Sequence, residues 1–138
     1  KKQIRNEFYY LVFYSNVFSV IIYLLILPNL TFLWTSKNIA SVLEKNDYIE
    51  NVSSVATIGY NEPSLIFELG TKVKVFNNIK NLKINYKKFD YLLIEKDYYM
   101  EFNEIVKEDY LSYNNIEKLK GFNFSKGKWI EVYLLKKL

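Results

Sequence analysis

Residues 8–34 read FYYLVFYSNVFSVIIYLLILPNLTFLW, and this stretch contains no Asp, Glu, Lys or Arg. Because a helix rises about 1.5 Å per residue, the part that precedes Pro28 spans about 30 Å, the thickness of the hydrocarbon core of a bilayer. A buried helix of a soluble protein seldom runs this long without a charge. A cleaved signal peptide has a shorter apolar core that ends in small residues, and no small-x-small site follows here. The stretch therefore predicts a transmembrane helix.

The flanking residues predict the orientation of this helix. Lys1, Lys2 and Arg5 precede it against one acidic residue, which under the positive-inside rule places this end in the cytoplasm. The residues that follow then lie outside, in the periplasm of a Gram-negative cell. Because the chain begins at a Lys without an initiator Met, we expect it to be a piece of a longer protein, in which residues 1–35 form a transmembrane helix. Residues 36–138 are then expected to be a periplasmic domain.

Composition narrows the chemistry that the chain can perform. The 138 residues contain no Cys and no His, which excludes thiolate chemistry, disulfides, the common zinc sites and a His general base within these residues. The net charge of +4 is small, and the basic residues are spread along the chain beside carboxylates. Binding to the phosphate backbone of nucleic acid needs a dense basic face. We therefore expect no nucleic-acid partner.

The pattern after the apolar stretch predicts an α/β domain. Residues 36–138 are enough for one small domain with a modest core. Ser36 suits the N-cap of a first helix, Pro63 the first position of a second, and Gly70 its C-terminal cap. A strand–helix–strand unit of this kind favours parallel pairing of its strands. The expected elements are a helix from Ser36, a strand over residues 53–58, a helix over 63–69 and a strand over 72–76.

The next segment supplies the strand that we expect in the middle of the sheet. Residues 89–95 read FDYLLIE, and a near-continuous apolar run of this kind is typical of a sheet that is covered on both faces. Residues 77–86 form a polar connection in which a short helix fits. A further helix is expected over residues 98–106, and residues 109–113 favour no single element.

The C-terminal part predicts a β-hairpin. Residues 116–124 and 128–136 are its expected strands, and Gly127 in the turn can take the positive φ that a tight turn needs. The predicted fold class is therefore α/β, with one N-terminal transmembrane helix followed by a small mixed-sheet α/β domain that closes with the hairpin.

The connection GYNEPS, residues 59–64, lies between a predicted strand end and a helix start, where open α/β sheets often bind ligands. Tyr60, Asn61 and Glu62 are the candidate residues for contacting substrate. A helix N-terminus can bind an anion, but Glu62 puts a negative charge where the anion would lie. Helix-start chemistry explains the same residues without a ligand, since Glu62 favours the helix dipole, Pro63 sets the first turn and Tyr60 packs. The sequence leaves both interpretations open.

A run of carboxylates surrounds the end of the predicted 89–95 strand. Paired carboxylates can bind a divalent cation or perform acid–base chemistry. The spacing matches no calcium-binding loop, however, and lysines lie among the acids. We expect a solvated surface here, because most charge runs are solvated faces, and we expect no metal ligand and no catalytic residue. The acidic residues are Asp90, Glu95, Asp97, Glu101 and Glu104.

Two segments resemble a known family. Residues 59–70, GYNEPSLIFELG, are similar to a Tyr-x-Glu-Pro-Ser-Leu-x-Phe-Tyr-Leu-Gly segment, and residues 121–128, GFNFSKGK, precede a final strand. After a last membrane helix, this order resembles the C-terminal end of bacterial lipid-linked glycosyltransferases, the aminoarabinose (lipid A) transferase and protein-mannosyltransferase-like superfamily. Glu68 stands where an aromatic residue is common in that family.

The resemblance implies a polytopic inner-membrane enzyme that transfers a sugar from a polyprenyl-phosphate donor to lipid A, lipopolysaccharide or protein on the periplasmic side. The family's catalytic carboxylate lies near the N-terminus of the full protein, so no catalytic residue is carried over to this chain. The chain would be the non-catalytic C-terminal portion, with membrane lipid, the upstream transmembrane helices and the polyprenyl-phosphate sugar donor as partners. No cofactor is implied for this segment, and any divalent cation would belong to the full-length enzyme.

Two other classes of function fit parts of the sequence. A single-pass, membrane-anchored extracytoplasmic binding or interaction module would show no further hydrophobic segment in the upstream reading frame, whereas the polytopic enzyme would show many. A soluble nucleotide-binding domain fits poorly, because the chain has no Gly-rich phosphate loop.

Overall fold

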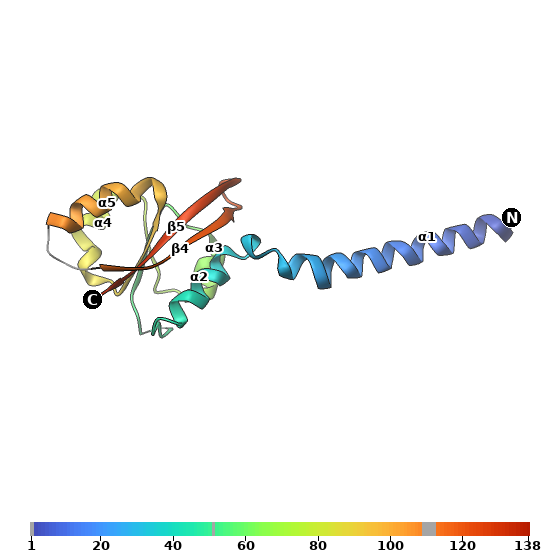
Figure 1. Ribbon diagram of the computed structural model, residues 1–138, viewed down its shortest axis with the longest axis horizontal. Coiled ribbons are helices and arrows are strands. Elements are labelled where there is room, and N and C mark those ends of the chain that lie inside the picture. Colours follow the sequence, from blue (N-terminus) through green and yellow to red (C-terminus); the bar gives the residue numbers. More distant parts are fainter. Residues whose placement is uncertain (1, 51, 109–112) are drawn as a thin grey trace. The chain divides into compact units, whose positions relative to one another are not determined.

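The computed structural model describes residues 2–50, 52–108 and 113–138. The chain forms two compact units, Lys1–Thr31 and Phe32–Leu138. The first unit is helical, and the second contains a five-stranded sheet with helices on its faces (Figure 1). The predicted fold class is confirmed: an N-terminal apolar helix precedes a mixed-sheet α/β domain that ends in a β-hairpin.

The N-terminal unit is a run of helical turns that change type near Pro28. Because proline has no N–H to donate to the preceding turn, α-helical hydrogen bonding cannot continue through it. Just before it, the Leu27 N–H bonds five residues back, to the Ile22 carbonyl, in the manner of a π-helix. The elements are α1 (Lys2–Ile21), the π-helical turn η1 (Ile22–Ile26) and the 3₁₀ turn η2 (Leu27–Asn29).

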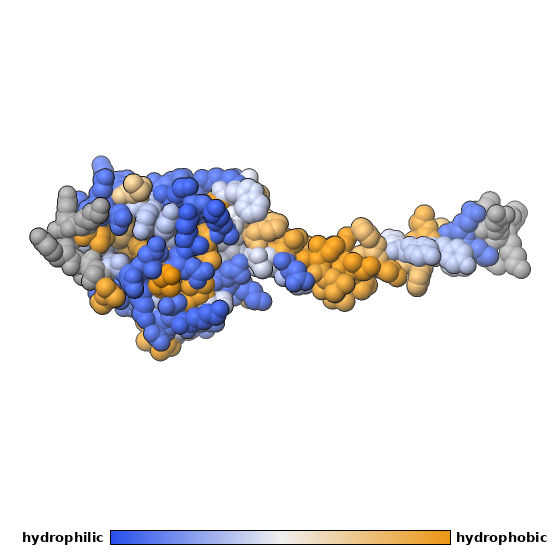
Figure 2. Space-filling view, in the orientation of Figure 1, coloured by the Kyte–Doolittle hydropathy of each residue, from blue (hydrophilic) through white to orange (hydrophobic). Residues whose placement is uncertain are grey.

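The segment Asn6–Asn29 is long and apolar enough to cross a membrane, by length and composition. Its large hydrophobic side chains are exposed in the isolated chain, and Figure 2 shows hydrophobic surface over much of this segment. Two polar side chains form hydrogen bonds within the helix: the Asn16 amide donates to the Val12 carbonyl at 2.7 Å, and the Ser19 hydroxyl donates to the Ser15 carbonyl at 2.9 Å. Such internal hydrogen bonds lower the cost of polar groups in lipid.

The second unit is a three-layer α/β domain with strand order β2-β1-β3-β5-β4. Strand β1 pairs in parallel with β2 and β3, and β5 pairs antiparallel with β3 and β4. The parallel pairing of the first two strands is as predicted. The strands are β1 (Val55–Ile58), β2 (Lys74–Phe76), β3 (Tyr91–Glu95), β4 (Tyr113–Asn123) and β5 (Lys128–Lys137). The helices are α2 (Thr35–Glu44), α3 (Pro63–Leu69), α4 (Ile79–Asn85) and α5 (Lys96–Glu108), and 3₁₀ turns span η3 (Thr31–Leu33) and η4 (Tyr86–Lys88).

Strand alternation builds a hydrophobic core on each face of the sheet. In β3, Tyr91 and Leu93 join the core under α2 and α3, whereas Leu92 and Ile94 join the core under α4 and α5. Successive side chains of a strand point to opposite faces, and every residue of β3 is buried. The apolar run that the sequence placed in the middle of the sheet therefore lies there.

Helix α2 begins one residue before the predicted start, and Ser36 is not its N-cap. Trp34 occupies the cap position, and no side chain caps the helix. Ser36 lies in the first turn and is buried, because its hydroxyl has hydrogen-bond partners in the β1–α3 connection. The sequence predicted that the Ser36 hydroxyl caps α2. In the structure this hydroxyl bonds instead to Tyr60 and Ser64, which are distant in the sequence.

The C-terminal hairpin is longer than predicted. Strand β4 begins at Tyr113 and β5 extends to Lys137, and Gly127 in the turn takes a φ of 61°. The ladder shifts register between Asn115 and Glu117. Of the segment 109–113, for which no element was favoured, residues 109–112 lie outside the described residues.

Candidate functional site

The carboxyl ends of β1 and β3 form the candidate functional site. These strands are parallel neighbours, yet the helices that follow them, α3 and α5, belong to the cores on opposite faces of the sheet. The two connections therefore diverge, and open α/β sheets bind ligands at such a point. Two groups of polar side chains lie here, which we call the hydroxyl cluster and the lysine cluster.

The hydroxyl cluster consists of Ser36, Tyr60, Glu62 and Ser64. Ser36 Oγ lies 2.7 Å from the Tyr60 hydroxyl and 2.8 Å from Ser64 Oγ. Glu62 Oε2 accepts hydrogen bonds from the Tyr60 hydroxyl at 3.3 Å and from Ser64 Oγ at 3.4 Å. The other oxygen, Oε1, accepts from the backbone N–H of Ser125 at 3.3 Å. The cluster thus joins α2, the β1–α3 connection and the β4–β5 turn.

Burial determines the acid–base properties of this cluster. The Tyr60 side chain is fully buried and Glu62 is 5% exposed. Burial raises the pKa of Tyr60 to about 12, and hydrogen bonding with Ser36 opposes this rise while the Glu62 charge adds to it. A phenol with this pKa stays protonated at neutral pH and cannot act as a general base. The cluster therefore holds structural elements together around a phenol that keeps its proton at neutral pH.

The three sequence-predicted candidate residues do not lie together. Tyr60 and Glu62 point into the hydroxyl cluster, whereas Asn61 is exposed and lines a small depression with Gly59 and Lys126. Pro63 is the first residue of α3, and Glu62 occupies the N-cap position without a capping hydrogen bond from its side chain. The packing of Tyr60 and the place of Pro63 agree with the helix-start interpretation.

The lysine cluster is built around Glu95, the last residue of β3, which is 2% exposed. Lys126 Nζ lies 2.7 Å from Glu95 Oε2 and donates to the Gly59 carbonyl at 2.7 Å. Lys128 Nζ lies 3.1 Å from Glu95 Oε1. Gly59 takes a φ of +84°, and a Cβ at this position would lie 2.5 Å from Glu95 Cβ. Only glycine satisfies both the backbone conformation and the close approach.

The prediction that the acidic stretch is a solvated surface is wrong for Glu95. Asp90, Asp97, Glu101 and Glu104 are exposed as expected. Glu95 is buried because its partners, Lys126 in the β4–β5 turn and Lys128 at the start of β5, lie about thirty residues later, and strand pairing brings them to the end of β3. Its place at the end of a continuous apolar run was the one signal in the sequence.

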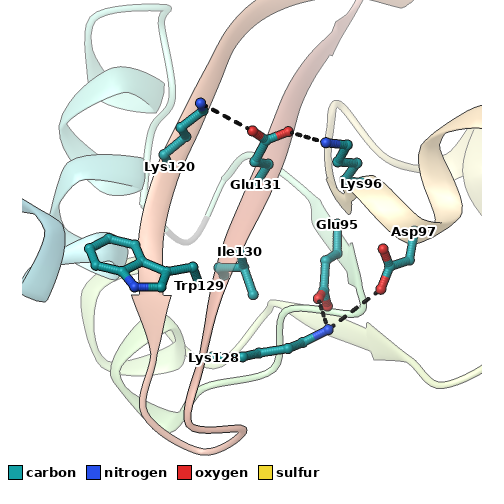
Figure 3. A pocket seen from close by; sticks show the side chains of 8 residues that line it. All are labelled: Glu95, Lys96, Asp97, Lys120, Lys128, Trp129, Ile130 and Glu131. Atoms are coloured by element: carbon teal, nitrogen blue, oxygen red, sulfur yellow. Dashed lines mark hydrogen bonds and ion pairs between the residues drawn. The ribbon is translucent and has the colours of Figure 1, made fainter.

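A second part of the lysine cluster surrounds Glu131 on β5. Lys118, Lys96 and Lys120 place their Nζ atoms 2.8, 3.0 and 3.3 Å from its carboxylate oxygens. Hydrogen bonds from Lys118 and Lys96 are the main cause that lowers the pKa of Glu131 to about 2. Glu95, Glu131 and Trp129 line one groove of about 400 Å³, and Figure 3 shows Glu131 between Lys120 and Lys96, and Lys128 between Glu95 and Asp97.

The lysine cluster carries more positive than negative charge. Its ion pairs join five lysines to the three carboxylates of Glu95, Asp97 and Glu131, which leaves an excess of two positive charges. This balance favours an anionic partner over a cation. In the ranges 2–50, 52–108 and 113–138, no group of three or more His, Cys, Asp or Glu side chains lies where it could hold a metal ion.

No family model, no curated protein and no solved structure matches this chain. The interpretation of its function therefore rests on its own residues and on the segments 59–70 and 121–128, which in the structure form the β1–α3 connection with α3 and the β4–β5 turn with its flanks.

Proposed function

We propose that this chain is the C-terminal, non-catalytic portion of a polyprenyl-phosphate-dependent glycosyltransferase of the inner membrane. The observation that carries the proposal is the position of the resembling segment 59–70. Its polar side chains, Tyr60 and Glu62, are buried and hydrogen-bonded to α2 and to the β4–β5 turn. Because these side chains hold elements of the domain together, they support a structural and not a catalytic role for it.

The proposed anchor is the segment Asn6–Asn29. It is long and apolar enough to cross a bilayer, and the side chains of Asn16 and Ser19 near its centre are hydrogen-bonded within the helix. The basic residues that precede it in the sequence favour a cytoplasmic N-terminal side, so the α/β domain is proposed to lie in the periplasm.

The transfer chemistry is proposed to take place in the upstream membrane helices. There the sugar passes from the polyprenyl-phosphate donor to lipid A, lipopolysaccharide or protein, and any divalent cation that the reaction needs is held there. The domain described here would stabilise that membrane part or help to seat the acceptor.

Topology is tested with reporter fusions at Leu138 of the full-length gene product. An alkaline phosphatase fusion, which is active only outside the cytosol, should be active, and a green fluorescent protein fusion at the same place should be dark. The protein should stay in the membrane pellet after alkaline carbonate extraction. A cytosolic reporter signal or release into the supernatant would refute the membrane assignment.

Transfer is tested in membranes that contain the full-length gene product, with a radiolabelled polyprenyl-phosphate sugar and extracted lipid A as substrates. We expect label in the acceptor, loss of most transfer when residues 32–138 are deleted, and retained transfer for Glu68→Gln, which changes an exposed residue of the same segment. Absence of transfer with every polyprenyl-phosphate sugar and acceptor tried would contradict the glycosyltransferase proposal.

A second candidate function is a single-pass, membrane-anchored binding or interaction module. The observation that favours it is that Phe32–Leu138 is a compact unit with its own core on each face of the sheet. The upstream reading frame distinguishes the two candidates. Several hydrophobic segments before Lys1 support the enzyme, and their absence supports the module.

A further inference from the structure

Several aromatic side chains are exposed at the turn end of the β4–β5 hairpin and at the start of the α/β domain. Trp34, Phe124 and Trp129 are 47%, 57% and 63% exposed. Trp129 packs against Phe32 and Phe122, with ring centroids 5.0 and 5.7 Å apart. Phe124 also contacts Phe122, at 5.3 Å, and lines a hollow with Trp34 and with polar residues that include Lys37 and Glu68. We call the five aromatic residues the aromatic end.

Positive charge borders the aromatic end. Trp129 lines the groove of the lysine cluster, in which three lysines and three carboxylates balance one another (Figure 3). The two remaining lysines of the cluster, Lys118 and Lys126, give the whole cluster an excess of two positive charges. Exposed tryptophans beside lysines are typical of protein surfaces at the membrane interface. There the amphipathic indole ring lies at the level of the headgroups, and ammonium groups attract lipid phosphates.

The covalent chain holds this surface near the apolar segment. Phe32 follows Asn29, the last residue of that segment, by three positions, and Trp34 follows it by five. A chain covers at most about 3.6 Å per residue, so Trp34 lies within about 18 Å of the end of the segment in any arrangement. Trp129 is ninety-five positions beyond Trp34 in the sequence but packs against Phe32. A segment that spans a bilayer would therefore carry the aromatic end close to the headgroups.

We propose that the aromatic end docks on the headgroup layer of the membrane that the apolar segment spans. The rings of Phe124 and Trp129 enter the interface, and the lysine cluster, whose five lysines outnumber its three carboxylates, attracts anionic lipid phosphates. Docking fixes the orientation of the α/β domain above the bilayer. This inference rests on the membrane anchor of the proposed function and not on the glycosyltransferase activity.

The two tryptophans of the chain, Trp34 and Trp129, make the proposal directly measurable. Trp34→Phe leaves Trp129 as the single reporter, and Trp129→Phe leaves Trp34. Each full-chain variant is reconstituted into vesicles of phosphatidylcholine and phosphatidylglycerol, with bromine placed on the lipids near the headgroup. Bromine quenches an indole only at short range, so quenching of Trp129 reports that its ring lies in the interface, as docking requires. Trp34 reports the same for the start of the domain.

We expect both single reporters to lose about half of their emission to the brominated lipid, as for indoles held in the interface, and to be shielded from aqueous acrylamide. An unquenched Trp129 would overturn the docking whatever Trp34 shows. Retention of the protein in the vesicles after alkaline carbonate extraction shows separately whether the anchor is inserted, and release would overturn the anchor. Near-UV circular dichroism of each variant confirms that the domain is folded.

The charge contribution is tested with Lys120→Gln, which leaves Glu131 its contacts with Lys96 and Lys118. Its matched control is Lys45→Gln, an exposed lysine at the C-terminal end of α2. The next residue, Asn46, accepts a hydrogen bond from Tyr91 at the start of β3, the opposite end of that strand from Glu95. Lys120→Gln should reduce the quenching of Trp129 in vesicles with phosphatidylglycerol, and Lys45→Gln should not. Equal quenching in the two variants would overturn the role of the lysines.

Discussion

Glu62 and Glu95 are two buried carboxylates at the carboxyl ends of neighbouring strands, and they are stabilised in different ways. Glu62 is held by two hydroxyls and one backbone N–H, at 3.3 to 3.4 Å. Glu95 is held by two ammonium groups, at 2.7 and 3.1 Å. Both carboxylates accept hydrogen bonds, but only the ammonium donors at Glu95 add the attraction of an opposite full charge. We therefore expect a substitution of Glu95 to lower the free energy of unfolding more than the same substitution of Glu62.

The largest effect is expected for Gly59→Ala, which disturbs the contact between the β1–α3 connection and Glu95. The new Cβ would lie 2.5 Å from Glu95 Cβ at a φ of +84°. We expect a loss of about 3 kcal/mol in the free energy of unfolding, from backbone strain and overpacking together. The matched control, Gly127→Ala, has a φ of +61° but open space around its Cβ, and it should cost about 1 kcal/mol. Urea unfolding of the full chain in detergent micelles measures both, and equal losses would contradict the close contact.

The next largest effect is expected for Glu95→Gln, and the same substitution at Glu62 provides the direct comparison. Glu95→Gln removes the charge that offsets Lys126 and Lys128, and breaking a largely buried ion pair should cost about 2 kcal/mol after allowance for the solvent that reaches the lysines. Glu62→Gln keeps a hydrogen-bond acceptor and should cost about 1 kcal/mol. The measurement is again the urea midpoint with its slope. A larger loss for Glu62→Gln than for Glu95→Gln would reverse the comparison.

Acid should weaken the lysine cluster. The folded-state pKa of Glu131 is lowered from 4.5 to about 2 by its lysine hydrogen bonds, so the folded state binds its proton more weakly than the unfolded chain does. Its contribution to stability is present above about pH 4.5 and is lost as the pH falls toward 2. The urea midpoint should fall over this window. Glu131→Gln should flatten the fall, and an identical pH profile for the variant would argue against these ion pairs.

Alkali should weaken the hydroxyl cluster instead. Burial raises the pKa of Tyr60 from 10.0 to about 12, so the folded state holds the phenol proton more tightly than the unfolded chain does. This contribution is present below about pH 10 and is lost as the pH rises toward 12. Tyr60→Phe should flatten that part of the stability profile. Absorbance at the tyrosinate band, which should show one phenol fewer titrating near pH 12 in the variant, checks the assignment independently.

Local patterns predicted most of the fold because they act within a few residues. The continuous apolar run of β3, Pro63 at the start of α3, Gly70 at its end and Gly127 in the hairpin turn are all where the sequence placed them. The candidate site was predicted less well. Tyr60 and Glu62 were identified, but their partners Ser36 and Ser125 are many positions away, and Ser36 was assigned to a capping role that it does not have.

By itself, the sequence determined that an uncharged apolar segment precedes an α/β domain, since hydrophobic periodicity and turn residues are properties of neighbouring positions. The tertiary structure alone decided that Glu95 is buried between Lys126 and Lys128 and that Trp129 packs beside Phe32. These pairs meet because the β3–β5 and β4–β5 ladders and the hairpin turn bring distant residues to one end of the sheet. A charged or aromatic side chain has several equivalent partners in a sequence, and only the fold selects the one it contacts.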